Sequence, residues 1–455
     1  MKLLKRIALT MLILLVLTTP SLSLAESDYE TGDGWIYQDG TLTITENNGM
    51  KDFVCLNMDW ETGDWKYQHS MFDVDSLVIG KNVTALENEI FMWDQILPTK
   101  STIELGNTSF IIESGWIVNT KTNTLYGAAD VVSMQSRSQI DDIPNQVEHI
   151  GNGALFNYRE ATSISIPNNV TSIGNQSFMW CQKLSSFEFP MKLQTVGFKA
   201  FEGCYQLERI SLGDSVSYVG VGAFSTCTGI KSIDIHNTKL YTISSDLFGA
   251  TFKLKVLELP EHVFRIETLA FRICYELNTL IINSSNLMIE EKAFLGCDRL
   301  NRIVFTKGTP KSFADFLFDE TEKTPDGKRY ISNSYERRGD IIPYPTLYYT
   351  AAYADEWAPN GETEWNGYAI QQISQEELDA ILAEARGESI PVVTGAPAQA
   401  ASVTTEPEPT VTSPDKYEPD QATSTTVEIL LLSAIAVVAV GIAVFAWLRK
   451  RKTMK

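Results

Sequence analysis

The segment Val170–Pro190, VTSIGNQSFMWCQKLSSFEFP, decides the fold because its pattern returns about every 23 residues from Val147 to Phe305. Each copy begins with Val or Leu, which is followed by Ile or Val and then by a pair made of a small residue and an apolar residue, usually Phe. A Cys and a Leu come next, and the copy ends in a short segment in which apolar residues alternate with others. The spacing between copies is constant, except that one copy is longer by a single position. The anchoring pairs are Ala154/Leu155, Ser177/Phe178, Ala200/Phe201, Ala223/Phe224, Leu247/Phe248, Ala270/Phe271 and Ala293/Phe294.

The end of each copy alternates apolar and other residues, which predicts a strand with one buried face and one outward face. The inward pairs are Ile164/Ile166, Phe187/Phe189, Ile210/Leu212, Ile233/Ile235, Leu257/Leu259, Leu280/Ile282 and Ile303/Phe305. One copy cannot bury its apolar side alone, so successive copies must stack on one another. In four copies a Gly follows the Ile or Val, where we expect a tight turn: Gly151, Gly174, Gly197 and Gly220.

Five of the six cysteines occupy one position of the repeat, and Tyr158 and Thr251 replace Cys there in two copies. Equivalent residues on adjacent coils lie about 5 Å apart, which is within disulfide range by distance alone. Because the position tolerates Tyr and Thr, buried reduced thiols are favoured, and disulfides stay open as the alternative. The expected repeat core is Phe178, Cys181, Phe201, Cys204, Phe224, Cys227, Phe248, Phe271, Cys274, Phe294 and Cys297.

The repeated segments, VTSIGNQSFMWCQKLSSFEFP and LQTVGFKAFEGCYQLERISL (Leu193–Leu212), resemble the repeats of BspA-like leucine-rich repeat surface proteins. Three flanking segments resemble parts of the same proteins: Asp33–Thr45 a β opening, Ile111–Gly127 an inserted hairpin and Thr346–Ile370 a closing segment. The resemblance implies a right-handed leucine-rich-repeat solenoid, mainly β, with a parallel β-ladder, that is displayed at a surface. It implies no chemistry.

Both ends of the chain carry targeting patterns. Lys2, Lys5 and Arg6 precede a short apolar run, which predicts a secretory signal peptide over residues 1–25, with an N-terminal membrane anchor as the alternative. Residues 429–448 are uncharged and apolar, long enough to cross a bilayer, and a basic tail follows over 449–455. This order predicts a single-pass membrane protein at the cell surface, with its N-terminus outside and a short cytoplasmic C-terminus. No LPxTG motif precedes the span, which favours a retained helix over a covalent wall anchor.

The remaining boundaries follow from composition. We expect an N-terminal β cap over 26–73, the repeat solenoid over 74–310 with an insertion at about 97–143, and a C-terminal cap over 311–386. The cap includes a short helix over Ser374–Gly387, which has a capping Ser and acidic residues in its first turn. Residues 387–428 are rich in Pro, Thr and Glu and predict an extended stalk.

The balance of charge limits the partners. The chain carries a net charge of −20, and its segments 1–25 and 449–455 contain no acidic residue, so the exported part is more acidic still. Nucleic-acid binding requires clustered Lys and Arg against phosphates and is therefore disfavoured. Extracellular proteins or glycans remain as the expected partners.

The sequence contains few patterns typical of catalytic or metal sites. The four histidines, His69, His149, His236 and His262, share no motif with a nucleophile or ligand, and no CxxC pair, phosphate loop or nucleophile elbow occurs. We therefore expect neither an enzyme nor a cofactor or metal site.

The outward positions of the predicted ladder are the candidate ligand-binding residues: Glu188, Arg209, Asp234, Val256, Glu258, Ile281, Arg302 and Val304. Val256, Ile281 and Val304 are not needed for the core, so they form either an exposed apolar strip, which would mark an interface, or a surface covered by the segment after Phe305. The favoured function is an adhesin-like binding protein held on a stalk. The alternative is a structural, envelope-organising surface protein without a host ligand.

Overall fold

The computed structural model describes residues 29–49, 74–86, 99–313, 318, 328–330 and 341–386. The predicted signal peptide, stalk, membrane span and basic tail lie outside these ranges, as do Cys55 and His69. Within the described ranges, no helix has the length and apolar character needed to span a bilayer. The predicted domain boundaries therefore stay predictions at both ends of the chain.

The described N-terminal region is a five-stranded sheet. Strands β1 (Tyr29–Gly32), β2 (Trp35–Gln38) and β3 (Thr41–Ile44) are antiparallel, and β4 (Ser76–Ile79) and β5 (Lys100–Ile103) continue the sheet in parallel. The expected inserted hairpin is present as β6 (Phe110–Glu113), β7 (Trp116–Asn119) and β8 (Thr124–Ala128), followed by helix α3 (Val131–Gln135). This region has its own apolar cluster around Trp35, Leu42 and Leu77.

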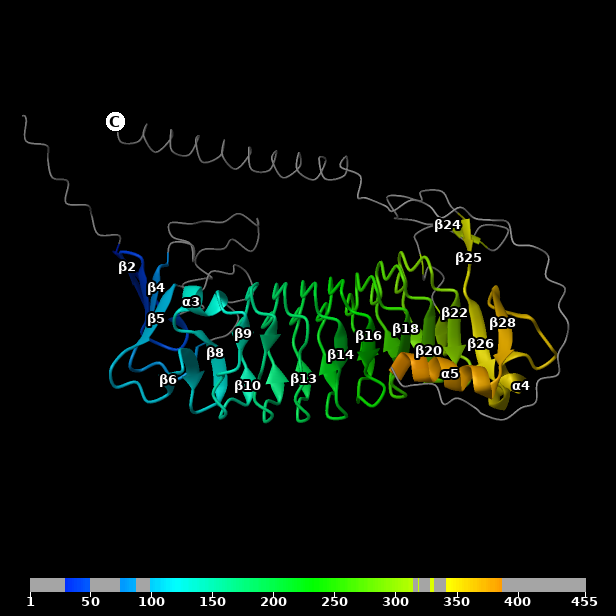
Figure 1. The fold of residues 1–455 in the computed structure, drawn as a ribbon, viewed down its shortest axis with the longest axis horizontal. Helices are drawn as coiled ribbons and strands as arrows, with labels where there is room; N and C mark the ends of the chain where they lie inside the picture. The colour runs from blue at the N-terminus through cyan, green and yellow to red at the C-terminus, as the bar shows by residue number, and fades with distance from the viewer. Residues whose placement is uncertain are drawn as a thin grey trace, which may run out of the picture. The chain divides into compact units, whose positions relative to one another are not determined.

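Two parallel ladders, rather than the single expected one, run along the repeats (Figure 1). The first ladder comprises β8, β10 (His149–Ile150), β12 (Ser172–Ile173), β13 (Thr195–Val196) and β15 (Tyr218–Val219), then β17 (Thr242–Ile243), β19 (Arg265–Ile266), β21 (Met288–Ile289) and β23 (Ser312–Phe313). The second ladder comprises β9 (Gln139–Ile140), β11 (Ser163–Ile164), β14 (Arg209–Ser211), β16 (Ser232–Asp234), β18 (Val256–Leu259), β20 (Thr279–Ile282), β22 (Arg302–Phe305), β26 (Thr346–Thr350) and β28 (Tyr368–Ile373). The second ladder is the one expected from the alternating pattern.

A column of stacked phenylalanine rings fills the space between the ladders and the turns. Phe178 and Phe201 stack with centroids 4.8 Å apart, and the column continues through Phe224, Phe248, Phe271 and Phe294. Offset stacking of this kind adds to the burial of apolar area. One continuous core extends from Trp116 to Ile370, as stacked coils require.

The glycines after the first-ladder strands allow close approach between adjacent coils. Gly174 and Gly197 are absent from the residues with positive φ, so their backbones need no left-handed conformation. A Cβ on Gly174 would lie 2.7 Å from the backbone nitrogen of Asn152, and one on Gly197 would lie 2.6 Å from that of Asn175. A turn does begin at this position, since the Ala154 amide donates to the Gly151 carbonyl at 3.3 Å, but glycine is required there because it lets adjacent coils come into contact.

The one longer coil interrupts both ladders. β15 is the last strand of one first-ladder sheet and β17 begins the next, and β16 and β18 likewise belong to separate sheets. The extra residue lies between Ile235 and Leu240, where the earlier coils are shorter by a single position. Backbone hydrogen bonds outside the named strands still cross this junction, as from the Lys239 amide to the Val216 carbonyl at 2.8 Å.

The C-terminal cap first adds strands to the second ladder and then places a helix against it. After the strand pair β24 (Lys328–Tyr330) and β25 (Ile341–Pro343), β26 pairs with β22, and η3 (Ala351–Tyr353), α4 (Ala354–Trp357) and β27 (Glu364–Trp365) lead to β28. The expected closing helix is α5 (Gln375–Arg386), and the Ser374 hydroxyl accepts a hydrogen bond from the Glu377 amide at 3.1 Å. Figure 1 shows α5 lying along strands of the second ladder, which it contacts at β16 and β18.

Candidate ligand-binding face

The outward face of the second ladder divides into two halves. In the first half the outward side chains are polar and exposed or half-buried; they are Ser163, Ser165, Ser186, Glu188, Arg209, Ser211, Ser232 and Asp234. We call this set the open half. In the second half the outward side chains are Val256, Glu258, Thr279, Ile281, Arg302 and Val304, and all but Arg302 are buried. We call this set the covered half.

A hollow lies on the open half, over the second-ladder segments of the first repeats. Its volume is about 490 Å³, and Ser163, Ser165, Ser186, Asp141 and Glu188 line it. We call it the serine hollow. None of the three serine hydroxyls, nor the Glu188 carboxylate, bonds to another protein group in the described part of the chain. These groups are therefore available to a ligand.

A second hollow, of about 510 Å³, lies on the first ladder, and two of its three charged side chains, Arg265 and Glu290, are paired with each other. Arg265 donates from Nε to Glu290 at 2.6 Å, and the second Glu290 oxygen accepts from the Thr268 amide at 2.9 Å. A ligand there would compete with existing bonds. The serine hollow is the better candidate site for this reason.

Helix α5 buries the covered half. Val256, Ile281 and Val304 form an apolar cluster with Leu378 and Ile381 of the helix, separate from the main core. The expectation of an exposed apolar strip is thus corrected, and the alternative, a cover supplied by the segment after Phe305, is what the structure contains. The physical reason is that α5 has its own apolar stripe, which needs a partner surface.

Two charged residues predicted as ligand contacts instead hold α5 in place. Glu258 is 4% exposed, and Arg386, the last residue of α5, donates to its two carboxylate oxygens at 2.7 and 2.8 Å. Asn283 donates a third hydrogen bond to Glu258 at 2.9 Å. Arg302 pairs with Glu377 at 2.9 Å and lies over the Tyr348 ring. A buried carboxylate requires such partners because burial removes its hydration.

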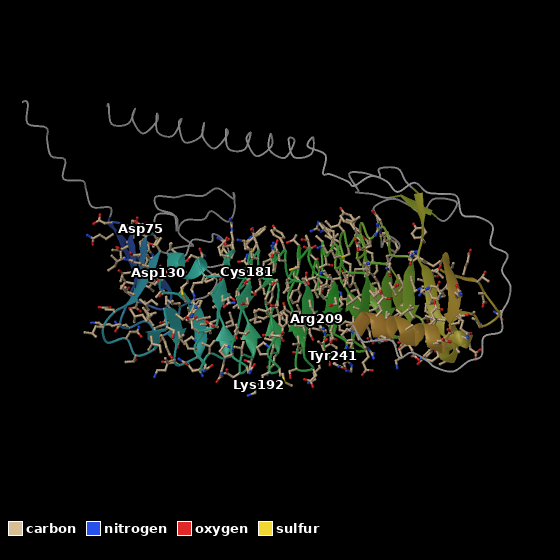
Figure 2. All side chains as sticks on the ribbon, viewed as in Figure 1. Asp75, Asp130, Cys181, Lys192, Arg209 and Tyr241 are labelled. Atoms are coloured by element: carbon tan, nitrogen blue, oxygen red, sulfur yellow. The ribbon has the colours of Figure 1, made fainter. Side chains whose placement is uncertain are left out.

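The remaining predicted contacts lie on the open half. Glu188 lies in the serine hollow, and Arg209, labelled in Figure 2, extends from β14 one coil further along. Asp234 on β16 lies 2.6 Å from Nδ1 of His236, so part of its hydrogen-bonding capacity is used within the protein. The structure thus brings together Glu188, Arg209 and Asp234 on one face and withdraws Val256, Glu258, Ile281 and Val304 beneath α5.

The serine hollow includes residues that the alternation pattern did not indicate. Asp141 and Gln139 come from the segment of β9, and Met191 follows the second-ladder segment of the next repeat; Phe189, which the alternation placed inward, is half-buried and also lines the hollow. Asp141 precedes the secure repeats, so the periodicity carried no signal for it. The side chain of Met191 is 86% exposed, and only its position beside a Pro marks it in the sequence.

The repeat cysteines are structural. Cys181 (Figure 2) is fully buried, as are Cys204, Cys227, Cys274 and Cys297, and all five are free thiols. Cys181 donates from Sγ to the carbonyl of Leu155 at 3.3 Å. Burial raises the pKa of the Cys181 thiol to about 12, so it stays protonated at neutral pH and is a poor nucleophile.

The described histidines are engaged in local contacts. Nδ1 of His149 lies 2.8 Å from the Ser172 hydroxyl of the next coil, and His262 lies 3.6 Å from Glu261. Among the described residues, no group of three or more His, Cys, Asp or Glu side chains is arranged to hold a metal ion.

Comparison with known proteins identifies the repeats. Residues 148–278 and 266–326 match the model of the BspA type leucine rich repeat region, in six copies. A leucine-rich repeat protein from Bacteroides ovatus is 17% identical, with a TM-score of 0.38, and the match covers 78% of this chain and 80% of that one. A leucine-rich repeat protein from Eubacterium ventriosum is also 17% identical, with a TM-score of 0.34, over 56% of this chain and 63% of that one. No curated protein matches the chain.

Proposed function

We propose that this chain, whose residues 148–326 match the BspA type leucine rich repeat region, is a cell-surface binding protein. Its open half attaches an extracellular protein or glycan, in the manner of an adhesin. The single observation that carries this proposal is the serine hollow, whose hydroxyls and Glu188 carboxylate have no partner within the described part of the protein. Leucine-rich repeat solenoids serve binding rather than catalysis, and we propose no enzymatic activity.

The proposal includes an anchored topology. The signal peptide expected over 1–25 would export the chain, and the span expected over 429–448 would hold it in the membrane with the basic tail inside. The stalk of 387–428 would separate the solenoid from the bilayer by a distance on the order of 100 Å if extended at about 3.1 Å per residue. Protease treatment of intact cells that produce the full chain tests this: the solenoid must be released while the tail remains with the cells.

Two features of the open half support a binding role. Its outward side chains contribute little to the core, since the inward partners Ile210 and Ile233 already supply it. The same face also combines a cation, Arg209, with carboxylates at Glu188 and Asp234, so it offers charges of both signs to a partner. Such charges set partner choice and association rate more than they set total affinity.

The test is binding of the full-length chain to arrays of extracellular-matrix proteins, mucins and glycans. We expect Glu188→Ala and Arg209→Ala to weaken a saturable interaction about tenfold each, since a hydrogen bond to a charged group contributes roughly 1.5 kcal/mol or more. Lys239→Ala is the matched control, because Lys239 is an exposed cation outside this face. Equal loss with Lys239→Ala, or no loss with either open-half variant, would contradict the proposal. A blank across all arrays would favour the envelope-organising alternative.

A further inference from the structure

The serine hollow has the chemistry of a site for an uncharged sugar. We propose that it binds the end of a neutral glycan and rejects acidic ones; this inference rests on the proposed binding function and names its ligand class. Three properties of the lining support it: its hydrogen-bonding groups, its apolar surface and the sign of its charge.

The hydrogen-bonding groups match a polyhydroxyl ligand. Ser163, Ser165 and Ser186 come from the second-ladder segments of two adjacent coils, and each hydroxyl can both donate and accept. Ser163 and Ser186 form a backbone bridge, so their side chains project from neighbouring positions in the ladder. Glu188 and Asp141 add acceptors only. A sugar hydroxyl also donates and accepts, and it fits a row of such groups better than a chain of peptide carbonyls would.

The apolar surface of the hollow comes from Phe189 and Met191. The Phe189 ring contacts the Phe187, Phe201 and Phe224 rings at centroid distances of 4.8–6.1 Å, which fixes its position. Met191 is largely exposed and adaptable. A pyranose ring presents C–H groups on its faces and hydroxyls at its edge. A small apolar surface beside free hydroxyls is complementary to that arrangement.

The charge of the hollow excludes anions. Its lining carries two ionisable side chains, Asp141 and Glu188, and both are carboxylates. Outside the lining, Arg137 lies 3.7 Å from Asp141 and is bound to Asp142 at 2.8 Å, and Arg209 lies on β14, one coil further along the face. A sialic acid, uronic acid or sulfated sugar would place a further negative charge beside these groups, and the described lining holds no cation to offset it. The volume of about 490 Å³ lies within the range of small-ligand sites.

The experiment measures the full-length chain against immobilised neutral oligosaccharides, acidic oligosaccharides and basic peptides. We expect wild type to bind neutral glycans at least tenfold more tightly than acidic ones. Ser163→Ala with Ser186→Ala should weaken neutral binding about tenfold or more. Asp141→Asn with Glu188→Gln should raise acidic-glycan binding about tenfold while it changes neutral binding much less. Ser217→Ala, an exposed serine on the first-ladder side, is the matched control and should change nothing.

Four outcomes overturn the inference, and they separate its failure from that of the proposed function. Equal wild-type binding to neutral and acidic glycans would overturn the charge argument. Preferential binding to basic peptides, lost with Glu188→Gln, would mean a protein ligand and would leave the proposed function intact. If neutral-glycan binding is unchanged by the serine-hollow variants but is lost with Arg209→Ala, the site lies elsewhere on the same face. Glycan binding that no open-half variant affects would remove both proposals.

Discussion

The open and covered halves of the second ladder share one repeat and one core but have opposite surfaces. Beneath both halves the same stack of Phe and Cys side chains is fully buried. Above it, Ser211 on β14 is exposed, whereas Ile281, its counterpart on β20, is 0% exposed beneath α5. A repeat therefore fixes what points inward, while the outward positions are free to serve a ligand or a neighbouring element.

Exchange of the residues at these counterpart positions should give the largest effect. Ile281→Ser leaves a cavity and a poorly satisfied hydroxyl between β20 and α5, which should weaken the docking of α5 by about 4 kcal/mol. Hydrogen exchange of the α5 amides should then accelerate up to roughly a thousandfold. The reciprocal change Ser211→Ile, on the exposed face, should leave stability within about 0.5 kcal/mol. Similar effects from the two changes would break the distinction between the halves.

The buried ion pair should rank next. Arg386→Ala leaves the Glu258 carboxylate buried, with Asn283 as its remaining hydrogen-bond partner among the described residues. Loss of one member of a buried pair typically costs about 3–5 kcal/mol, and we expect about 2–3 kcal/mol because Arg386 is 32% exposed. Urea denaturation, monitored by protease cleavage of the chain on the C-terminal side of α5, would measure this loss of stability. Glu377→Ala is the control, because it removes the carboxylate that pairs with Arg302 and that carboxylate is more exposed than Glu258. Its cost in free energy of unfolding should be well under half that of Arg386→Ala.

Matched changes in the shared core should show that the two halves are alike below the surface. Cys204 lies under the open half and Cys274 under the covered half, and they donate to Phe178 and Phe248 carbonyls at 3.2 and 3.1 Å. Each Cys→Ala change removes one buried atom and a weak hydrogen bond to a carbonyl, and Cys274→Ala also removes a contact with the Thr251 hydroxyl at 3.3 Å, so each should cost about 1–2 kcal/mol. Chemical denaturation of both variants checks this. A difference above about 1 kcal/mol would mean that α5 changes the core as well as the surface.

The smallest effect on stability is expected when the exposed ion pair between Lys231 and Glu208 is removed. The two residues lie on adjacent coils at the edge of the open half, with Nζ of Lys231 2.7 Å from Oε1 of Glu208. The hydrogen bond and the charge of Lys231 lower the pKa of Glu208 below its ordinary value. Lys231→Ala should return that pKa to its usual range, which an NMR titration would follow, and should leave the thermal midpoint unchanged. A clear drop in the midpoint would show that surface pairs hold the open coils together. Exposed pairs in general contribute little.

The amino-acid pattern was sufficient to predict the stacked coils, the inward residues of the second ladder and the closing helix. Each has a signal that repeats or that follows from local chemistry: Phe201 has an equivalent in successive repeats, Leu257 and Leu259 alternate, and Ser374 precedes a helical pattern. The first ladder could not be predicted, because its strands are mostly short and have one inward residue, as in Ser172–Ile173. So short a strand shows no alternation, and the Gly positions that follow it suggested a turn.

The tertiary structure alone settled which outward residues remain available to a ligand. Glu188 and Glu258 occupy equivalent repeat positions, and the periodicity assigns them the same expected role. Glu258 is buried because Arg386, 128 residues later, meets it across the α5 interface. Exposure depends on contacts between distant segments, whereas periodicity records only the environment that every coil shares. The repeat pattern therefore predicted the core of this protein, and the folding of α5 onto the ladder decided its accessible surface.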